Sequence, residues 1–249
     1  MSQKTRAELK TEVKQIFKGR WKSAVLLCII VSLLSIFSIM SNYSDRFQSQ
    51  ANPNDSATSW HALTKLGGIT GTQISLVLAV MAGFLLVQLA VWLIVQIFRV
   101  GTSYAMLDWI RQPDRPIHPV SDSTIGFTKQ YGWSLVGLII YKTVLVFLWT
   151  LLLIVPGLIK LYAYSQTYYI YKDMLAATPA GQPRPRYRDA VTRSRQLMNG
   201  HKWQLVVLQL SFLGWALLSA LTAGIGQLWL KPYQYGVMAN YYDNLQAIS

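Results

Sequence analysis

Long apolar stretches constrain the fold of this chain more than any other feature. They run over about residues 21–40, 73–98, 133–171 and 203–242. A transmembrane helix needs roughly 20 apolar residues to cross a hydrocarbon core of about 30 Å, and each stretch meets that requirement. Only 13% of the 249 residues are charged, whereas soluble domains carry about 25%. A soluble core cannot bury all of these stretches, so we expect an integral membrane protein.

The two longest stretches are each too long for one helix, and each contains a break. Pro156-Gly157 interrupts the third stretch near its middle, and the sequence TAGIG from Thr222 to Gly226 interrupts the fourth. Proline and glycine disfavour a helix interior and favour turns. Both stretches are therefore predicted to be helical hairpins. Together with the first two stretches they predict an all-α polytopic membrane protein with six transmembrane helices.

The basic residues predict the orientation. Of 23 Lys and Arg, only Arg46 and Lys65 fall in the polar segment 41–72 between the first two spans. Because Lys and Arg collect on the cytoplasmic side of a membrane, this segment is expected outside, the polar segment 99–129 inside, and both termini in the cytoplasm. The net charge of +13 is spread over short segments between spans, so we expect no nucleic-acid partner.

A pattern recurs three times along the chain. The leads IFKGRW, TKQYGW and LMNGHKW end at Trp21, Trp133 and Trp203, and an outward span follows each. Each return span ends in a cation, tyrosines and an aspartate; the aspartates are Asp108, Asp173 and Asp243. The chain is therefore expected to form a single membrane domain, 1–249, of three repeated helical hairpins. The repeats cover about residues 5–112, 121–175 and 187–247.

The first lead is amphipathic. Between Glu8 and Phe17 the apolar residues recur at helical spacing, with lysines between them. This predicts an interfacial helix whose apolar face enters the headgroup region while its lysines meet anionic lipid at the cytoplasmic face. A weaker example covers residues 189–198. We expect the tryptophans that follow the leads, Trp21, Trp133 and Trp203, to be anchors at the inner interface.

The second and third repeats carry a resemblance to a known family. The phrases LMNGHKW, PGLIKLYAYS and LTAGIGQLWLKPY, which end at Trp203, Ser165 and Tyr233, are similar to the bacterial family called domain of unknown function 975. The resemblance covers nearly the whole chain apart from the segment 41–72. It implies a multi-pass plasma-membrane protein, typically of Gram-positive bacteria, and it implies no activity or catalytic residues.

Three lysines lie within the apolar stretches and are the candidate binding residues. Lys142 lies about nine residues into the third span, where a central lysine costs about 2.5 to 3.5 kcal/mol. It is expected either to bind an anionic lipid headgroup or carboxylate, or to snorkel or bond to polar groups. Lys160 and Lys231, with nearby tyrosines, either form a cationic ring with aromatic walls or simply pack. Those tyrosines are Tyr164 and Tyr235.

The return aspartates are expected to cap helices or to pair with nearby basic residues. No acidic residue lies in the middle of a span, which disfavours proton or sodium coupling through buried carboxylates. Motifs of known catalytic sites are missing, the three histidines are widely separated, and Cys28 is the single cysteine. We therefore expect no enzyme activity, no metal and no cofactor.

Three functional hypotheses follow. The first is a non-enzymatic protein that binds membrane lipids or a partner protein and supports envelope homeostasis or resistance to membrane-active compounds; the partner is either another membrane protein or a second copy. The second is a transporter or channel for small molecules or lipid, for which repeats and broken apolar stretches are an indicator. The third is an intramembrane enzyme that uses Ser134 or a tyrosine as nucleophile.

Overall fold

The regular secondary structure is helical throughout the residues that the computed structural model describes. These residues are 4–34, 36, 71–128, 130–179 and 181–248, with the side chains of 71–74 excepted. The predicted all-α class is confirmed for this part of the chain. The elements are α1 (Arg6–Phe17), a helix Trp21–Leu34, α4 (Gly71–Arg111), α5 (Pro119–Ser123), a 3-10 turn η2 (Ile125–Phe127), α6 (Gly132–Leu152), α7 (Ile154–Ala163), α8 (Thr167–Ala177), α9 (Tyr187–Leu197), α10 (Lys202–Leu210), α11 (Leu213–Leu221) and α12 (Gln227–Ile248). The predicted outside segment 41–72 falls outside the described residues, apart from the last two, which begin α4.

Helix α4 is longer than the sequence predicts. It has 41 residues and spans about 60 Å at 1.5 Å per residue. The predicted end at Phe98, with a polar connector from Arg99, is wrong, because the helix continues to Arg111. Two causes favour the continuation: no proline occurs between residues 71 and 112, and the last turns bury large side chains, including Trp109, in the core.

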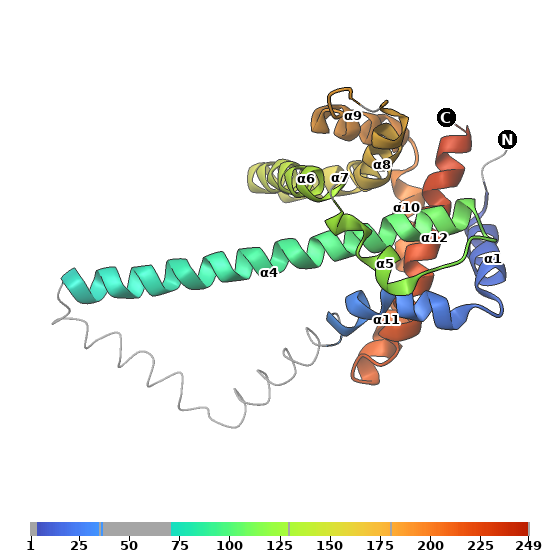
Figure 1. Ribbon diagram of the computed structural model, residues 1–249, viewed down its shortest axis with the longest axis horizontal. Coiled ribbons are helices and arrows are strands. Elements are labelled where there is room, and N and C mark those ends of the chain that lie inside the picture. Colours follow the sequence, from blue (N-terminus) through green and yellow to red (C-terminus); the bar gives the residue numbers. More distant parts are fainter. Residues whose placement is uncertain (1–3, 35, 37–70, 129, 180, 249) are drawn as a thin grey trace.

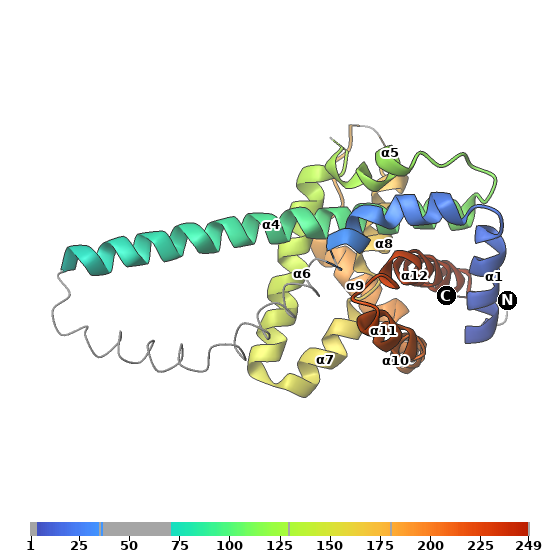
Figure 2. The same ribbon diagram turned by 90° about the horizontal axis from the view of Figure 1, so that it is seen from below.

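The two halves of α4 have different environments. Residues 75–91 are exposed on every side of the helix, and this half projects away from the rest of the described chain (Figures 1 and 2). The second half packs against α5, α6, α8 and α12. A lone apolar helix exposed around its whole circumference is typical of a segment that lipid covers.

Three helical segments are long and apolar enough to cross a membrane. Within the described residues they are Ser75–Arg111, Gly132–Leu152 and Lys202–Leu221. These segments do not run parallel. Helix α4 lies horizontally in both views, whereas α6 is seen nearly end-on in Figure 1 and upright in Figure 2. Helices α10 and α11 lie near the upright α12 in Figure 1. The chain is therefore a multi-pass helical protein by length and hydropathy.

The reversal between α6 and α7 occurs three residues earlier than predicted. The break is Leu153, whose backbone is extended (φ −158°, ψ 137°). Pro156 instead lies in the first turn of α7, where a helix does not need the missing N–H. Gly157 lets the two helices approach closely, since a Cβ there would lie 2.5 Å from Thr150 Oγ1.

The reversal before α12 occurs where the sequence predicts it. Helix α11 ends at Leu221 and α12 begins at Gln227. Between them Ala223 and Gly224 have φ of 51° and 88°. This left-handed backbone ends a right-handed helix and turns the chain back. Helix α12 then contacts α11, α4 and α1.

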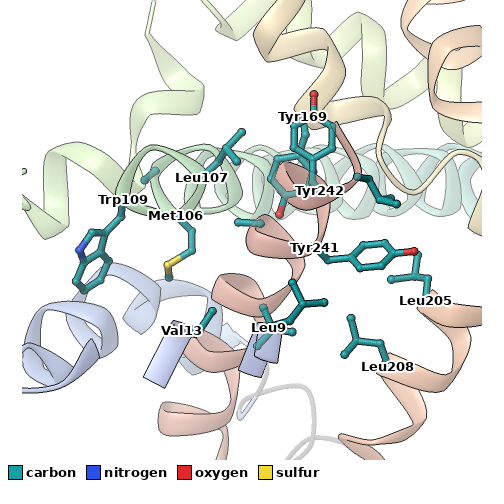
Figure 3. Packing of buried hydrophobic residues seen from close by; sticks show 14 of the residues in the cluster. Leu9, Val13, Met106, Leu107, Trp109, Tyr169, Leu205, Leu208, Tyr241 and Tyr242 are labelled. Atoms are coloured by element: carbon teal, nitrogen blue, oxygen red, sulfur yellow. The ribbon is translucent and has the colours of Figure 1, made fainter. Parts of the chain in front are cut away.

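The main core lies where α1, α4, α10 and α12 meet (Figure 3). Leu9 and Val13 of α1 are 2% and 0% exposed. The prediction that this apolar face enters the headgroup region is therefore wrong; it packs on α12. A Cβ on Gly236 would lie 2.7 Å from Val13 Cγ1, so this glycine lets α1 pack directly on α12. The helix is amphipathic as predicted, but a neighbouring helix covers its apolar face in place of lipid.

Candidate functional site

A cavity of about 470 Å³ lies between α4, α8, α10 and α12. We call it the central cavity. Its volume is within the roughly 300 to 1,000 Å³ that small-molecule sites occupy. Its lining combines aromatic rings with amides, hydroxyls and one ammonium group. The lining residues are Ser103, Ser165, Gln166, Tyr168, Tyr169, Leu205, Gln209, Phe212, Lys231, Gln234, Tyr235 and Met238.

Gln166 gives the central cavity a polar group that the described residues leave unsatisfied. It is 2% exposed. Its Nε2 donates to Ser165 Oγ at 3.1 Å, whereas its Oε1 has no partner within the described chain. A buried polar atom without a partner is rare in native structures and marks a place where water or a ligand binds. Because the amide can rotate, Gln166 offers a ligand either a donor or an acceptor.

Lys231 gives the central cavity its charge. Its charged neighbour is Arg99 of α4, another cation. Neither side chain forms an ion pair with an acid among the residues that the structure describes. Tyr235, one turn along α12, lines the same cavity. Arg99 is exposed and does not line the cavity. An uncompensated ammonium in the lining, with a second cation nearby, favours an anionic ligand.

Lys142 lines a second cavity, of about 590 Å³, on the α6 side. Its Nζ lies 4.1 Å from the centroid of the Tyr168 ring, a cation–π contact. Tyr168 and Ser165 line both this cavity and the central one. Helix α8 therefore presents one aromatic ring between the cavity of Lys142 and the cavity of Lys231.

The structure does not bring Lys160 and Lys231 into one cationic ring. Lys160 of α7 lies over the Trp149 ring, 4.5 Å from its centroid, and it does not line the central cavity. Tyr164 is buried with Val191 in a separate small core cluster. The two lysines have equivalent places in the sequence, but α7 folds back on α6 while α12 packs on α4 and α1.

The three predicted tryptophan anchors have different environments. Trp133 and Trp203 are 85% and 72% exposed, as a residue at the headgroup level would be. Trp21 is half-buried, and its ring lies edge-on to Phe17 with centroids 5.1 Å apart. Trp21 therefore contributes to protein packing beside α1.

The return aspartates pair with basic side chains, as predicted. Arg111 joins Asp173 of α8 at 2.7 Å and Asp243 of α12 at 2.8 Å. Asp108 pairs with the buried Lys172, which also donates to the Tyr104 carbonyl at 2.7 Å. The ends of α4, α8 and α12 are thereby held together. The sequence did not identify these partners, because they come from separate parts of the chain.

Comparison with known families gives one match. The family described as "Protein of unknown function (DUF975)" matches residues 1–178 and 151–249, so the two ranges together cover the whole chain. The chain belongs to the DUF975 family. The comparisons found no match among curated proteins and none among solved structures. The resemblance noted in the sequence is thereby confirmed, and the family description assigns no activity.

Two leads of this DUF975 chain share the same local geometry. Gly19 follows α1 and precedes the helix that begins at Trp21; Gly200 follows α9 and precedes α10. Both glycines have φ of 79°, in the region that glycine adopts without strain. Each turn ends an amphipathic helix and starts an apolar one. The lead before Trp133 differs, because α5 and η2 precede α6 there.

The described part of the DUF975 chain has no cluster of three or more His, Cys, Asp or Glu that would hold a metal ion. Its buried Asp122 and half-buried Asp108 pair with Arg115 and Lys172. The central cavity instead presents an ammonium and amides, which are groups that can bind a polar anionic group.

Proposed function

We propose that this protein is a non-enzymatic plasma-membrane protein that binds an anionic lipid or a similar anionic amphiphile in the central cavity. The observation that carries this proposal is the ammonium of Lys231, which lines a polar cavity between apolar helices, has no acidic partner among the described residues and has a second cation, Arg99, nearby. An anionic headgroup in this cavity would meet both the ammonium of Lys231 and the amide of Gln166. We propose that this binding supports envelope homeostasis or resistance to membrane-active compounds.

The proposed topology has six spans arranged as three hairpins of one ancestry, with both termini in the cytoplasm. Gly19 and Gly200 have the same φ of 79°, and this shared turn before an apolar helix supports a repeat of the first and third hairpins. The exposed first half of α4 is the surface we propose for lipid, a membrane-protein partner or a second copy of the chain. We propose a Gram-positive bacterial source, because the family that the sequence resembles is typical of these bacteria.

Native mass spectrometry of protein gently extracted from its own membrane tests the ligand. Wild type is expected to retain a discrete added mass. Lys231→Gln is expected to lose it, because an anionic group would no longer meet the ammonium. Lys160→Gln is the matched control, since Lys160 also lies in an apolar helix but does not line the central cavity. Equal adducts in all three proteins, or none in any, would contradict the proposal.

A second candidate function is a transporter for small molecules or lipid. The observation that favours it is that Tyr168 and Ser165 line both the cavity of Lys231 and the cavity of Lys142. A ligand that passes from the cavity of Lys231 to the cavity of Lys142 would move past Tyr168 through the interior of the protein. Anion or lipid flux in proteoliposomes, abolished by Lys142→Leu, would support transport; wild-type flux equal to that of empty liposomes would contradict it.

The proposal of no enzyme activity is supported by the environment of Ser134. This serine is 1% exposed, and Arg184 donates a hydrogen bond to its Oγ. A nucleophilic serine needs a neighbouring base to take its proton. A guanidinium is already protonated at neutral pH and cannot do so. The contact is therefore a structural hydrogen bond between α6 and the segment before α9.

A further inference from the structure

A third cavity, separate from the two above, lies against α1. It has a volume of about 510 Å³, and its walls come from α1, α11, α12 and the helix that begins at Trp21. We call it the aromatic slot. Most of its lining is apolar, with three indole rings and one phenol. The lining residues are Lys10, Lys14, Trp21, Trp215, Leu218, Ser219, Thr222, Gly226, Trp229, Leu230 and Tyr233.

The charged lining residues of the aromatic slot are Lys10 and Lys14, one helical turn apart on the same face of α1. Lys10 Nζ donates to Ser211 Oγ at 2.6 Å and lies 4.5 Å from the centroid of the Phe212 ring. Lys14 Nζ lies 5.7 Å from the centroid of the Tyr233 ring. Both ammonium groups are therefore held over aromatic rings at the slot.

The acids of α1 do not neutralise these lysines. Glu12 pairs with Lys4 at 2.8 Å and accepts from Asn240, and Glu8 closes the N-terminal capping box with Thr5. Burial, together with the nearby charges of Arg6 and Lys14, lowers the pKa of the Lys10 ammonium. The positive charge at this end of the slot is thus uncompensated within the described residues.

Shape and charge together select the ligand class. An apolar, aromatic-walled slot favours a hydrocarbon chain, because each buried methylene contributes about 0.8 kcal/mol. Two ammonium groups at the same slot favour a carboxylate or phosphate. The slot shares no lining residue with the central cavity, and Phe212 and Tyr233, whose rings meet edge to face, lie between them.

We propose that the aromatic slot binds a single-chain anionic amphiphile. The chain lies among Trp21, Trp215 and Trp229, and the anionic head meets Lys10 and Lys14. This site does not depend on the central cavity, so either one can fail without the other. The head is a carboxylate, as in a fatty acid, or a phosphate, as in a lysophospholipid.

Quenching of tryptophan fluorescence tests the site with the full chain in nanodiscs of a neutral phospholipid. The probes are dodecanoate and dodecyl phosphate, each carrying bromine at the chain end; brominated dodecanol has the same chain without the charge. Wild type is expected to show saturable quenching by both anions that the unlabelled anion displaces. Tighter binding of dodecanoate assigns the carboxylate head, and tighter binding of dodecyl phosphate assigns the phosphate head.

The double variant Lys10→Gln/Lys14→Gln is expected to weaken binding of both anions at least tenfold and to leave dodecanol unchanged. Lys18→Gln/Lys22→Gln is the matched control: it removes the same charge from exposed positions nearby that do not line the slot. Trp229→Ala, at a half-exposed ring, is expected to weaken all three probes. Equal losses in both double variants, or no saturable quenching of wild type, would overturn the proposal.

Discussion

Arg111 Nη1 lies 2.7 Å from Asp173 Oδ1, although the two residues are 62 positions apart in the chain. The same guanidinium reaches Asp243 through Nε, and the Tyr242 hydroxyl donates to Asp173 at 2.7 Å. One side chain of α4 therefore ties α8 to α12. This contact joins the ends of the return helices of the three predicted repeats.

Arg111→Gln is expected to destabilise the protein by about 1–2 kcal/mol. The variant loses three hydrogen bonds to the carboxylates of Asp173 and Asp243, but the groups are partly exposed and solvent screens them. The measurement is the thermal unfolding midpoint in detergent. Arg188→Gln, at an exposed arginine of α9, is the control and should unfold like wild type. Equal midpoints for all three proteins would show that the contact does not stabilise the fold.

Glu12 is expected to make the docking of α1 pH-dependent. Burial raises its pKa, but hydrogen bonds from Lys4 and Asn240 outweigh burial and lower the pKa below its ordinary value of 4.5. Because the folded pKa lies below the unfolded one, the stabilisation is fully present above pH 4.5 and is lost as the pH falls through the folded value. Screening of this half-exposed group keeps the contribution under about 1 kcal/mol.

The measurement is the unfolding midpoint of wild type and Glu12→Gln from about pH 7 to about pH 3. The glutamine keeps the acceptor oxygen but does not titrate. Wild type should be the more stable of the two at neutral pH, and the difference should shrink as the pH falls below 4.5. A difference that stays constant with pH would rule out this role for Glu12.

Gly236→Ala is expected to destabilise the protein by about 1–3 kcal/mol through overpacking. The new methyl would lie 2.7 Å from Val13 Cγ1 and 3.1 Å from Phe17 Cζ, so α1 must shift. Val13→Ala should recover part of the loss when it is combined with Gly236→Ala. Gly214→Ala is the control, since a Cβ there meets nothing within 4 Å. Additive losses in a double-mutant cycle would contradict a direct clash.

Gln166→Leu is expected to raise the stability of the ligand-free protein and to weaken ligand binding in the central cavity. A leucine of similar size removes the unpartnered Oε1, whose burial costs about 1–3 kcal/mol. Gln209→Leu, at an exposed residue of the same lining, should not stabilise the protein. The unfolding midpoint and the retained mass in native mass spectrometry check both effects. A destabilised variant would show that water or protein already satisfies this amide.

Cysteine labelling tests the proposed orientation. Cys28, the single native cysteine, is fully buried, so Cys28→Ser gives a background without a reactive thiol. In that background Ser56→Cys, in the segment 41–72, should react with an impermeant maleimide on intact cells. Gln182→Cys, in an exposed turn before α9, should react only after the cells are opened. The reverse pattern would mean that the positive-inside interpretation is wrong.

Sequence alone predicted the features that depend on local chemistry. Apolar stretches long enough for a bilayer predicted the all-α class and the apolar helices. The TAGIG segment predicted the turn before α12, because its left-handed backbone is a local property of Ala223 and Gly224. Pairing of the return aspartates with basic residues was also predicted from their place at the cytoplasmic ends of the spans, but their partners were not. The helical class and the turn could be predicted because each depends on residues that are close together in the sequence.

Only the tertiary structure decided which residues meet. Lys160 and Lys231 have equivalent places in the sequence, but one stacks on Trp149 and the other lines the central cavity. The amphipathic pattern of α1 is the same whether lipid or α12 covers its apolar face. Helix α4 continues past Arg99 because distant side chains bury its last turns. Hydropathy shows that the apolar face of a helix must be kept from water. Packing between distant segments decides whether protein or lipid covers that face. The central cavity and the aromatic slot arise from that packing and have no signature along the chain.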